Sequence, residues 1–493
     1  MSPVSPSPYR GVNYLDWSAE DTVLSIRNRS VTARDYISSV LDRAQQGKSL
    51  NAFINLLPDY ALSAADKLDR AIAHGDELPP LAGLAIVAKD NINMAGFPTT
   101  AGTAALQHSR PSNTAPSLKK LIAAGAIVIG KTNMHELAFG ITSTNLQPFA
   151  GPVHNPYAEN MIPGGSSGGT AAAIASRVVS CGLGTDTGGS ARIPAALTGI
   201  VGFRPSVGDG GKQRRYHDEG AVVPISHTRD TVGVLGRTVA DVTLLDSAIT
   251  RRLRVNQPTR LHGLRFGVPP VLWSGLDKKV EHAALWASQA LQKAGVILVK
   301  DDIPKLLKLD ATIGNVLALH EPLADIPAYL NASDVRGVSL QNIVDGIASP
   351  DVKAIFGSVL NDTFASEYND TIAVRRPALQ KLYADYFTEK RVDAILFPTT
   401  ILPATPIDTV RGSGHVSING GPPIDAFAAY TRNAGPGSNA GLPGLSLPIG
   451  ITNTLRPIGI EINGPLGSDE RLLSLGLALE HVFGHLPPPP NYK

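Results

Sequence analysis

The chain has 493 residues, of which 43% are apolar and 17% charged, and its formal net charge at pH 7 is +2. This composition is typical of a globular protein, and so small a net charge gives no electrostatic basis for binding nucleic acid or a membrane. The single cysteine, Cys181, excludes an internal disulfide and a cysteine-based metal cluster. No run approaches the ~18 apolar residues that a membrane span needs. Because residues 1–11 also lack the features of a signal peptide, we expect a cytoplasmic protein.

Helix and strand patterns alternate in the N-terminal part of the chain. After a proline- and serine-rich leader, residues 18–44 predict two amphipathic helices, the second capped at Ser30 or Thr32, and residues 59–74 predict a third. The short apolar run 84–88 predicts a buried strand. Residues 115–129 predict a helix, a stop and a second buried strand, and this helix-to-strand unit indicates an α/β protein.

Lys89 stands directly after the apolar run 84–88. A lysine in such a position is usually solvated or salt-bridged. Here the apolar residues before it favour burial, and Asp90, Asn91 and Asn93 supply hydrogen-bond partners. Burial favours the neutral form of a lysine, and a neutral amine can act as a base. Lys89 is therefore a candidate general base.

Two glycine- and serine-rich clusters, GGSSGG at 164–169 and DTGGS at 186–190, flank an alanine-rich segment. Residues 170–176 predict a helix, residues 178–183 a buried strand, and residues 191–197 a second helix. Ser190 thus stands where a strand ends, a glycine loop turns and a helix begins. Glycines in that loop let several N–H groups point into one concavity, and the helix N-terminus adds positive potential. An oxyanion hole can be built in this way, with Ser190 as its nucleophile.

Other motif matches in the chain fail on their context. Ser117 and Lys120 fit S-x-x-K, but the companion S-D-N and K-T-G motifs are absent, and HELAF at 135–139 has phenylalanine where a zinc protease needs histidine. The first cluster fits G-x-S-x-G, but no strand precedes it. It has no distinctive histidine partner among His217, His227, His262 and His320. Nucleotide-binding glycine motifs are absent, and we expect neither a metal nor an organic cofactor.

The segment 163–203 resembles the amidase signature, the glycine- and serine-rich core of a large family of C–N hydrolases. VAKDN at 87–91 resembles the lysine motif of that family, and NAGLPGLSLP at 439–448 resembles its C-terminal motif. The likeness extends from about residue 20 to 485 and is weakest between about 270 and 390. It implies a large mixed sheet between helix layers, with a helical cap.

The resemblance also implies the catalytic residues. They form a Ser-cisSer-Lys triad in which Ser190 is the nucleophile, Ser166 is the serine preceded by a cis peptide bond, and Lys89 is the base. The backbone N–H groups of Thr187, Gly188, Gly189 and Ser190 would form the oxyanion hole. Beside them, Asp186 and Arg192 are expected to pin the loop as an ion pair, and Ser167 to position the glycine cluster.

Two stretches outside the signature, at 133–142 and 223–233, resemble the branch of indoleacetamide and mandelamide hydrolases. Leu137, Phe139 and Ile141 alternate along an expected extended segment, so they either line a hydrophobic acyl pocket or belong to the ordinary core. Substrate contacts are expected at Gly140, Ile141 and Thr142.

These observations predict one α/β domain over 1–493, with a signature core at about 80–240, a helical cap at about 305–390 and a C-terminal return to the sheet at about 391–485. Further strands are expected at 263–268, 392–400 and 456–464, further helices at 277–294 and 468–483, and an exposed tail at the C-terminus.

The expected function is hydrolysis of a small carboxamide, preferably an arylacetamide such as indole-3-acetamide, to a carboxylate and ammonia. Alternatives are cleavage of anilides, carbamates or ureas, and a glutamine-hydrolysing amidotransferase subunit, which would need partner proteins. The joint presence of Lys89, Ser166 and Ser190 argues against a binding module without activity. The sequence is compatible with a homodimer.

Overall fold

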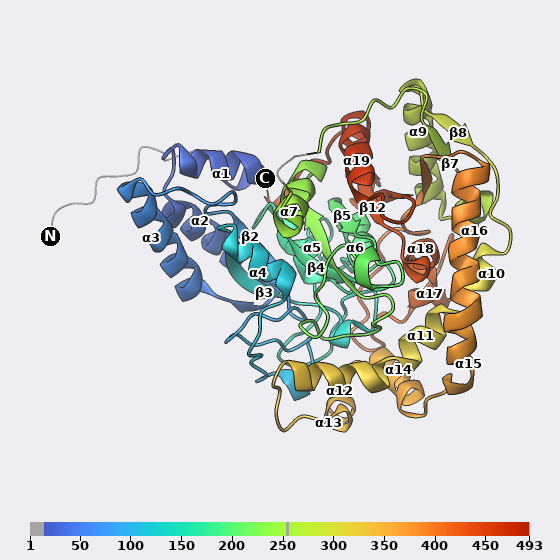
Figure 1. The fold of residues 1–493 in the computed structure, drawn as a ribbon, viewed down its shortest axis with the longest axis horizontal. Helices are drawn as coiled ribbons and strands as arrows, with labels where there is room; N and C mark the ends of the chain where they lie inside the picture. The colour runs from blue at the N-terminus through green and yellow to red at the C-terminus, as the bar shows by residue number, and fades with distance from the viewer. Residues whose placement is uncertain (1–13, 253–255, 493) are drawn as a thin grey trace.

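A mixed sheet of eleven strands runs through the computed structural model, which describes residues 14–252 and 256–492 (Figure 1). The leader at 1–13 lies outside the described residues. The strand order is β1-β3-β2-β4-β6-β5-β12-β13-β9-β7-β8. The strands are β1 (Phe53–Leu56), β2 (Ala85–Lys89), β3 (Ile127–Thr132), β4 (Cys181–Asp186), β5 (Val201–Arg204), β6 (Thr231–Gly236), β7 (Arg265–Gly267), β8 (Ile297–Val299), β9 (Ala394–Pro398), β12 (Gly444–Ile451) and β13 (Pro457–Asn463).

The strand directions divide the sheet into three parts. Strands β3, β2 and β4 are parallel, the run from β4 through β6, β5, β12 and β13 to β9 is antiparallel, and β9, β7 and β8 are again parallel. The edge strand β1 is added to the first part by antiparallel pairing with β3. A separate ribbon pairs β10 (His415–Val416) with β11 (Ile424–Asp425). The predicted mixed α/β architecture is therefore confirmed.

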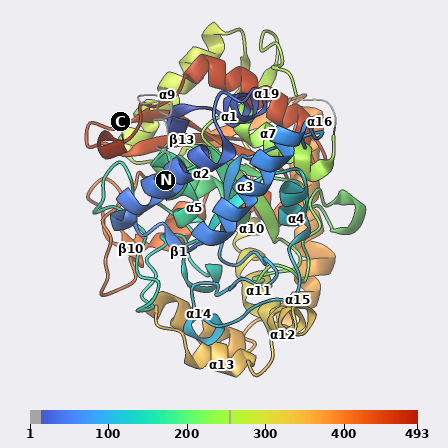
Figure 2. The same ribbon diagram turned by 90° about the vertical axis from the view of Figure 1, so that its left-hand side faces the viewer.

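Helices cover both faces of the sheet because the strands are apolar on both. In β2, Ile86 and Ala88 belong to one buried cluster, and Ala85 and Val87 belong to another on the opposite face. The first cluster holds α1 (Ala19–Arg27), α4 (Pro116–Ala123), α7 (Val239–Thr250), α9 (Lys278–Lys293) and α19 (Asp469–Phe483). The second holds α2 (Ala33–Gln46), α3 (Pro58–His74) and α5 (Gly168–Ala175), and Figure 2 shows α2 beside α3.

The chain leaves the sheet after β8 and returns at β9, and the intervening segment is mostly helical, as predicted. It forms α10 (Leu306–Asp310), α11 (Gly314–His320), α12 (Pro322–Ala332), α13 (Leu340–Asp345), α14 (Pro350–Leu360), α15 (Ala365–Asp370), a π-helical turn (Thr371–Arg375) and α16 (Arg376–Glu389). Helices α11 to α14 lie along the lower edge of the molecule in Figure 1. They pack on the loops that follow β3 and precede β6, where the rings of Phe139 and Phe356 are 4.7 Å apart.

Short helices complete the fold: α6 (Arg192–Thr198), α8 (Pro270–Trp273), α17 (Ala426–Thr431) and α18 (Gly435–Ala440). None of the helices in the described ranges is long and apolar enough to cross a membrane.

Thr32 is the N-cap of α2, which settles the choice between Ser30 and Thr32.

The structure corrects several expectations. The strand expected at 178–183 is Cys181–Asp186, because the turn after α5 takes up residues 176–180. Residues 136–138, expected to be extended, form a 3-10 turn in which Leu137 has a φ of 54°. The C-terminal tail is not wholly exposed, since Tyr492 is buried in the cluster formed by α2, α3 and α5.

Candidate active site

The ends of two neighbouring parallel strands bring the first candidate residues together. Strands β2 and β4 pair through Ala88 and Leu183, so their carboxyl ends meet at one edge of the sheet. Lys89 is the last residue of β2, and Thr185 and Asp186 are the last two of β4. The sheet therefore sets a lysine beside the loop that carries the second glycine-serine cluster.

Lys89 is fully buried and bonded only to hydroxyl groups. Its Nζ donates to Ser166 Oγ and to Thr185 Oγ1, both at 2.7 Å. Of the described carboxylates, none lies within 4.0 Å of this nitrogen. Burial lowers the pKa of Lys89 from 10.5 to about 7, against the opposing influence of Asp186 and Asp230. A large fraction of Lys89 is thus neutral near pH 7 and can accept a proton.

The expected partners of Lys89 were wrong. Asp90 instead forms a buried ion pair with Lys131 at 3.1 Å, and Asn93 donates to Asn113 and Ser333. Asn91 reaches Lys89 only indirectly, because its Nδ2 donates to Thr185 Oγ1.

Ser166 is held by its backbone and by the neighbouring serine. The peptide bond between Gly165 and Ser166 is cis, as the resemblance implies. The carbonyl oxygen of Ser166 accepts the N–H of His135 at 3.2 Å. Ser167 Oγ donates to the carbonyl of Thr185 at 3.1 Å and accepts its N–H at 3.2 Å, which confirms that Ser167 positions the glycine cluster.

Ser190 lines a cavity and is linked through its backbone to the first glycine-serine cluster. The N–H of Ser167 donates to the Ser190 carbonyl at 3.2 Å, which links the two clusters. In the described chain, Ser190 Oγ forms no hydrogen bond, and the structure has no direct bond between the two candidate serine hydroxyls. Gly189 turns the loop with a φ of +124°, a conformation that only glycine adopts readily.

One of the four backbone N–H groups expected to form the oxyanion hole already donates a hydrogen bond within the protein. The N–H of Gly189 donates to Asp186 Oδ1 at 2.9 Å, contrary to the expectation for that residue. The N–H groups of Thr187, Gly188 and Ser190 have no acceptor in the described part of the chain. These three amides, in the loop that leads into α6, remain able to bind a developing oxyanion.

A buried ionic network fixes the loop, as expected for Asp186 and Arg192. Arg192 Nη2 and Nε donate to the two carboxylate oxygens of Asp186 at 2.9 and 3.0 Å, and its Nη1 pairs with Glu461. Although burial opposes ionisation, the guanidinium groups of Arg192 and Arg204 hold the pKa of Asp186 below its ordinary value. This carboxylate therefore organises the loop and does not act as the base.

The cavity that Ser190 faces has a volume of about 440 Å³. Its walls come from the loop after β3, the loop before β6, the cap and α17, and they include Phe139, Ile141, Ile225, Ala318, Leu319, Ile355 and Phe427. Of the three residues expected to contact substrate, Ile141 lines this cavity. Gly140 and Thr142 do not, because both lie against the ring of His135.

The amidase family model matches residues 35–473 of the chain. The chain belongs to the amidase family. It is 40% identical to an indoleacetamide hydrolase of Agrobacterium vitis over 469 residues, covering 94% of this chain and 97% of that protein. It is 38% identical to a mandelamide hydrolase of Pseudomonas putida, covering 94% and 91% of the two chains. The peptide amidase structure from Stenotrophomonas maltophilia superposes with a TM-score of 0.80 at 26% identity, over 97% of this chain and 99% of that one.

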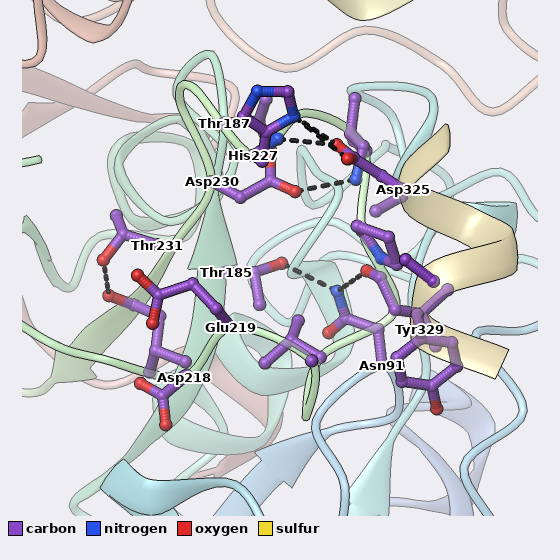
Figure 3. Close-up of a pocket in the computed structure, with 18 of the residues that line it drawn as sticks. Asn91, Thr185, Thr187, Asp218, Glu219, His227, Asp230, Thr231, Asp325 and Tyr329 are labelled. Carbon is purple, nitrogen blue, oxygen red and sulfur yellow. Dashed lines mark hydrogen bonds and ion pairs between the residues drawn. The ribbon is translucent and has the colours of Figure 1, made fainter. Parts of the chain in front are cut away.

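A second cavity of about 280 Å³ lies beside the Lys89 site of this amidase (Figure 3). Figure 3 shows Asn91 on its wall, with the amide nitrogen directed at Thr185. Elsewhere on its wall, Asp325 Oδ1 of α12 lies 3.0 Å from His227 Nδ1, and this bond raises the pKa of His227. Glu321 also lies near His227, but it accepts hydrogen bonds from Ser226 and Thr228, so this acidic group ties the cap to the loop before β6.

Sequence reasoning missed several residues at the site of this amidase. Thr185 bridges Lys89 and Asn91, and Asp230 accepts the hydroxyl of Thr187 at 2.6 Å. The position of Thr185 at the end of a buried strand could have identified it. For the cap residues that line the cavity, no local pattern distinguishes a wall from an ordinary helix face.

Proposed function

We propose that this amidase hydrolyses primary arylacetamides, such as 2-phenylacetamide and indole-3-acetamide, to the carboxylate and ammonia. The observation that carries the proposal is the contact at 2.7 Å between buried Lys89 and Ser166, next to a nucleophile that opens into an apolar cavity. The relatives named above as hydrolases of indoleacetamide and mandelamide support an aryl group on the acyl side.

In the proposed mechanism, neutral Lys89 takes the proton of Ser166 while Ser166 takes the proton of Ser190. Ser190 Oγ attacks the amide carbon, and the open amides of the loop stabilise the oxyanion. The relay then returns the proton to the departing nitrogen, which leaves as ammonia. A water molecule, deprotonated by the same relay, attacks the acyl-enzyme and releases the carboxylate.

The aromatic and aliphatic walls of the cavity explain a preference for aryl amides. Burying a ring against Phe139, Ile141 and Leu319 stabilises the bound transition state in proportion to the apolar area removed from water. Acetamide lacks that area, so its kcat/KM should be lower by about 10- to 200-fold or more.

The test is a comparison of kcat/KM for acetamide, 2-phenylacetamide, indole-3-acetamide and acetanilide with the purified chain. Ala318→Trp, which would fill the cavity from α11, should lower kcat/KM for the aryl amides far more than for acetamide. Ala365→Trp, on the exposed surface of α15, is the matched control. Equal rates on acetamide and the aryl amides, or a preference for acetanilide, would refute the proposal.

A further inference from the structure

Arg229 is the one cationic side chain among the described residues that line the Ser190 cavity. It is only 6% exposed and lies two residues before the start of β6. Its neighbour Asp230 accepts the hydroxyl of Thr187 in the oxyanion loop. The guanidinium group is therefore built into the same wall as the loop that would hold the reacting carbonyl.

Two hydrogen bonds fix the guanidinium group and leave one of its nitrogens open. Arg229 Nε donates to Ser226 Oγ at 3.3 Å, and Nη1 donates to Asn439 Oδ1 at 2.8 Å. Ser226 in turn donates its proton to buried Glu321, so its oxygen is free to accept from Arg229. In the described part of the chain, Nη2 donates to no acceptor. It is not among the fully buried polar atoms that lack a partner, so part of its surface is accessible. Because Arg229 lines the Ser190 cavity, Nη2 is the nitrogen left to bind an acceptor placed there.

Arg229 also lacks a direct counter-charge. No described carboxylate lies within 4.0 Å of it, whereas the equally buried Arg192 pairs with Asp186 and Glu461. The carboxylates that act on Arg229 from farther away are those of Glu321, Asp230 and Asp310. Burial lowers the pKa of Arg229, but a guanidinium stays protonated at neutral pH.

An unpaired buried cation is costly, and an acceptor oxygen placed in the cavity would offset part of that cost. The rest of the wall near Ser190 is mostly apolar, which suits a ring. The cavity thus combines a site for an aromatic body with one fixed, charged N–H donor.

We propose that Arg229 binds an acceptor oxygen, hydroxyl or carboxylate, carried by the acyl part of the substrate. The preferred substrates would then be arylacetamides with such an oxygen rather than the unsubstituted amides. This inference rests on the proposed function for its aryl amide class and adds the polar group that the acyl part carries.

The test compares three amides that share one ring. The parent is 2-phenylacetamide, mandelamide carries a hydroxyl beside the amide carbon, and the monoamide of 1,4-phenylenediacetic acid carries a carboxylate at the far end. With the wild-type chain, at least one substituted amide should have a KM about 10- to 100-fold below the parent, the range for a hydrogen bond to a charged group. The two substituted amides distinguish the hydroxyl from the carboxylate.

Arg229→Gln should remove that advantage mainly through KM, because the contact exists in both the bound substrate and the transition state. Arg229→Lys should retain part of it for the carboxylate, since lysine keeps the charge but loses the forked donors. The matched control is Arg214→Gln. Arg214 is buried beside the same loop, donates to the carbonyl of His227 at 2.7 Å and lines the second cavity. This control should keep the wild-type ratio of KM values.

A binding measurement separates this inference from the proposed function. Calorimetry with the Ser190→Ala chain and the monoamide of 1,4-phenylenediacetic acid, and in parallel mandelamide, reports affinity without turnover. Adding Arg229→Gln, or Arg229→Lys if the glutamine variant does not fold, should weaken the tighter ligand by at least about tenfold. Unchanged affinity and an unchanged KM ratio would overturn the role of Arg229. Absence of turnover of all three amides by the wild-type chain would instead refute the proposed function.

Discussion

Lys89 and Lys131 are both fully buried at the ends of neighbouring strands, but only Lys131 has a carboxylate partner. Burial lowers the pKa of Lys131, and the ion pair with Asp90 opposes that shift. Lys89 contacts only the hydroxyls of Ser166 and Thr185. Of these two buried amines, Lys89 is therefore the one whose neutral form is not opposed by a carboxylate in direct contact.

The first prediction concerns the pH dependence of the reaction. Because the pKa of Lys89 is about 7 and its neutral form is the proposed base, kcat/KM should rise as pH increases through about 7 and then level off. Lys89→Ala should lose at least about 100-fold in kcat/KM, the lower end of what general base catalysis contributes. Lys89→Arg should not restore the rate, because a guanidinium does not deprotonate. A pH profile that is flat from 5.5 to 8.5 would contradict this role.

The same pKa predicts a change in stability with pH. Lys89 has a pKa of about 7 in the folded protein and its ordinary 10.5 in the unfolded chain. Between these values the unfolded chain binds more protons, so the contribution of Lys89 to the free energy of unfolding increases with pH. Urea unfolding at pH 7 and pH 9.5 should show a larger increase for the wild type than for Lys89→Met. The idea fails if both proteins gain equally.

The third prediction separates the two serines. Ser190→Ala should abolish turnover and labelling by a fluorophosphonate, because no other hydroxyl would face the open amides. Ser166→Ala should retain Ser190 but react at least about 100-fold more slowly, since Lys89 loses its link to the nucleophile. Mass spectrometry of the labelled chains checks both. Labelling of Ser190→Ala at the wild-type rate would exclude Ser190 as the nucleophile.

The fourth prediction concerns the ion network beneath the loop. Asp186→Asn leaves buried Arg192 and Arg204 without one of their carboxylates, which should lower the free energy of unfolding by about 3–5 kcal/mol. The matched control is Asp66→Asn, which breaks an exposed pair with Arg34 and should cost much less stability, because solvent screens that pair. The measurement is urea unfolding. Similar losses in the two variants would show that burial adds nothing to the Asp186 pairs.

The fifth prediction tests the buried C-terminal tail. Tyr492 is 6% exposed, and Arg43 of α2 lies 5.8 Å from the centre of its ring. Tyr492→Ala should lower the free energy of unfolding by about 1–3 kcal/mol, whereas the exposed Asn491→Ala should change it by less than about 0.5 kcal/mol. Thermal melts of the two variants would decide. Equal melting temperatures would mean that the packing of Tyr492 contributes no stability.

The sequence predicted the elements whose residues follow a simple period. The apolar run before Lys89 and the helix after Ser190 are local features, so their strand and helix were recognised. Strands β1, β5 and β12 were not predicted, because β1 and β5 are only four residues long, glycine, serine and proline interrupt the apolar residues of β12, and pairing within the sheet stabilises all three.

The residues of the candidate site also fall into a group that the sequence predicted and a group that it did not. The resemblance supplied Lys89, Ser166 and Ser190, and strand ends alone supplied a reason for the first and last. The bond from Gly189 to Asp186, and the fact that Gly140 and Thr142 face His135, depend on how distant segments pack. The same holds for Arg229, whose partner Asn439 lies 210 residues away in sequence. The composition of the chain and the spacing of its residues do not reveal such long-range contacts.

The position of the cap between β8 and β9 has a consequence for how this chain can diverge. Helices α11 and α14 supply cavity walls, while Lys89, Ser166 and Ser190 all come from residues that precede β5. Part of the wall that would recognise the acyl group is thus encoded in a stretch of the gene separate from the proposed catalytic residues. Substitutions, or a transplanted cap, could retune substrate choice while the proton relay is inherited unchanged.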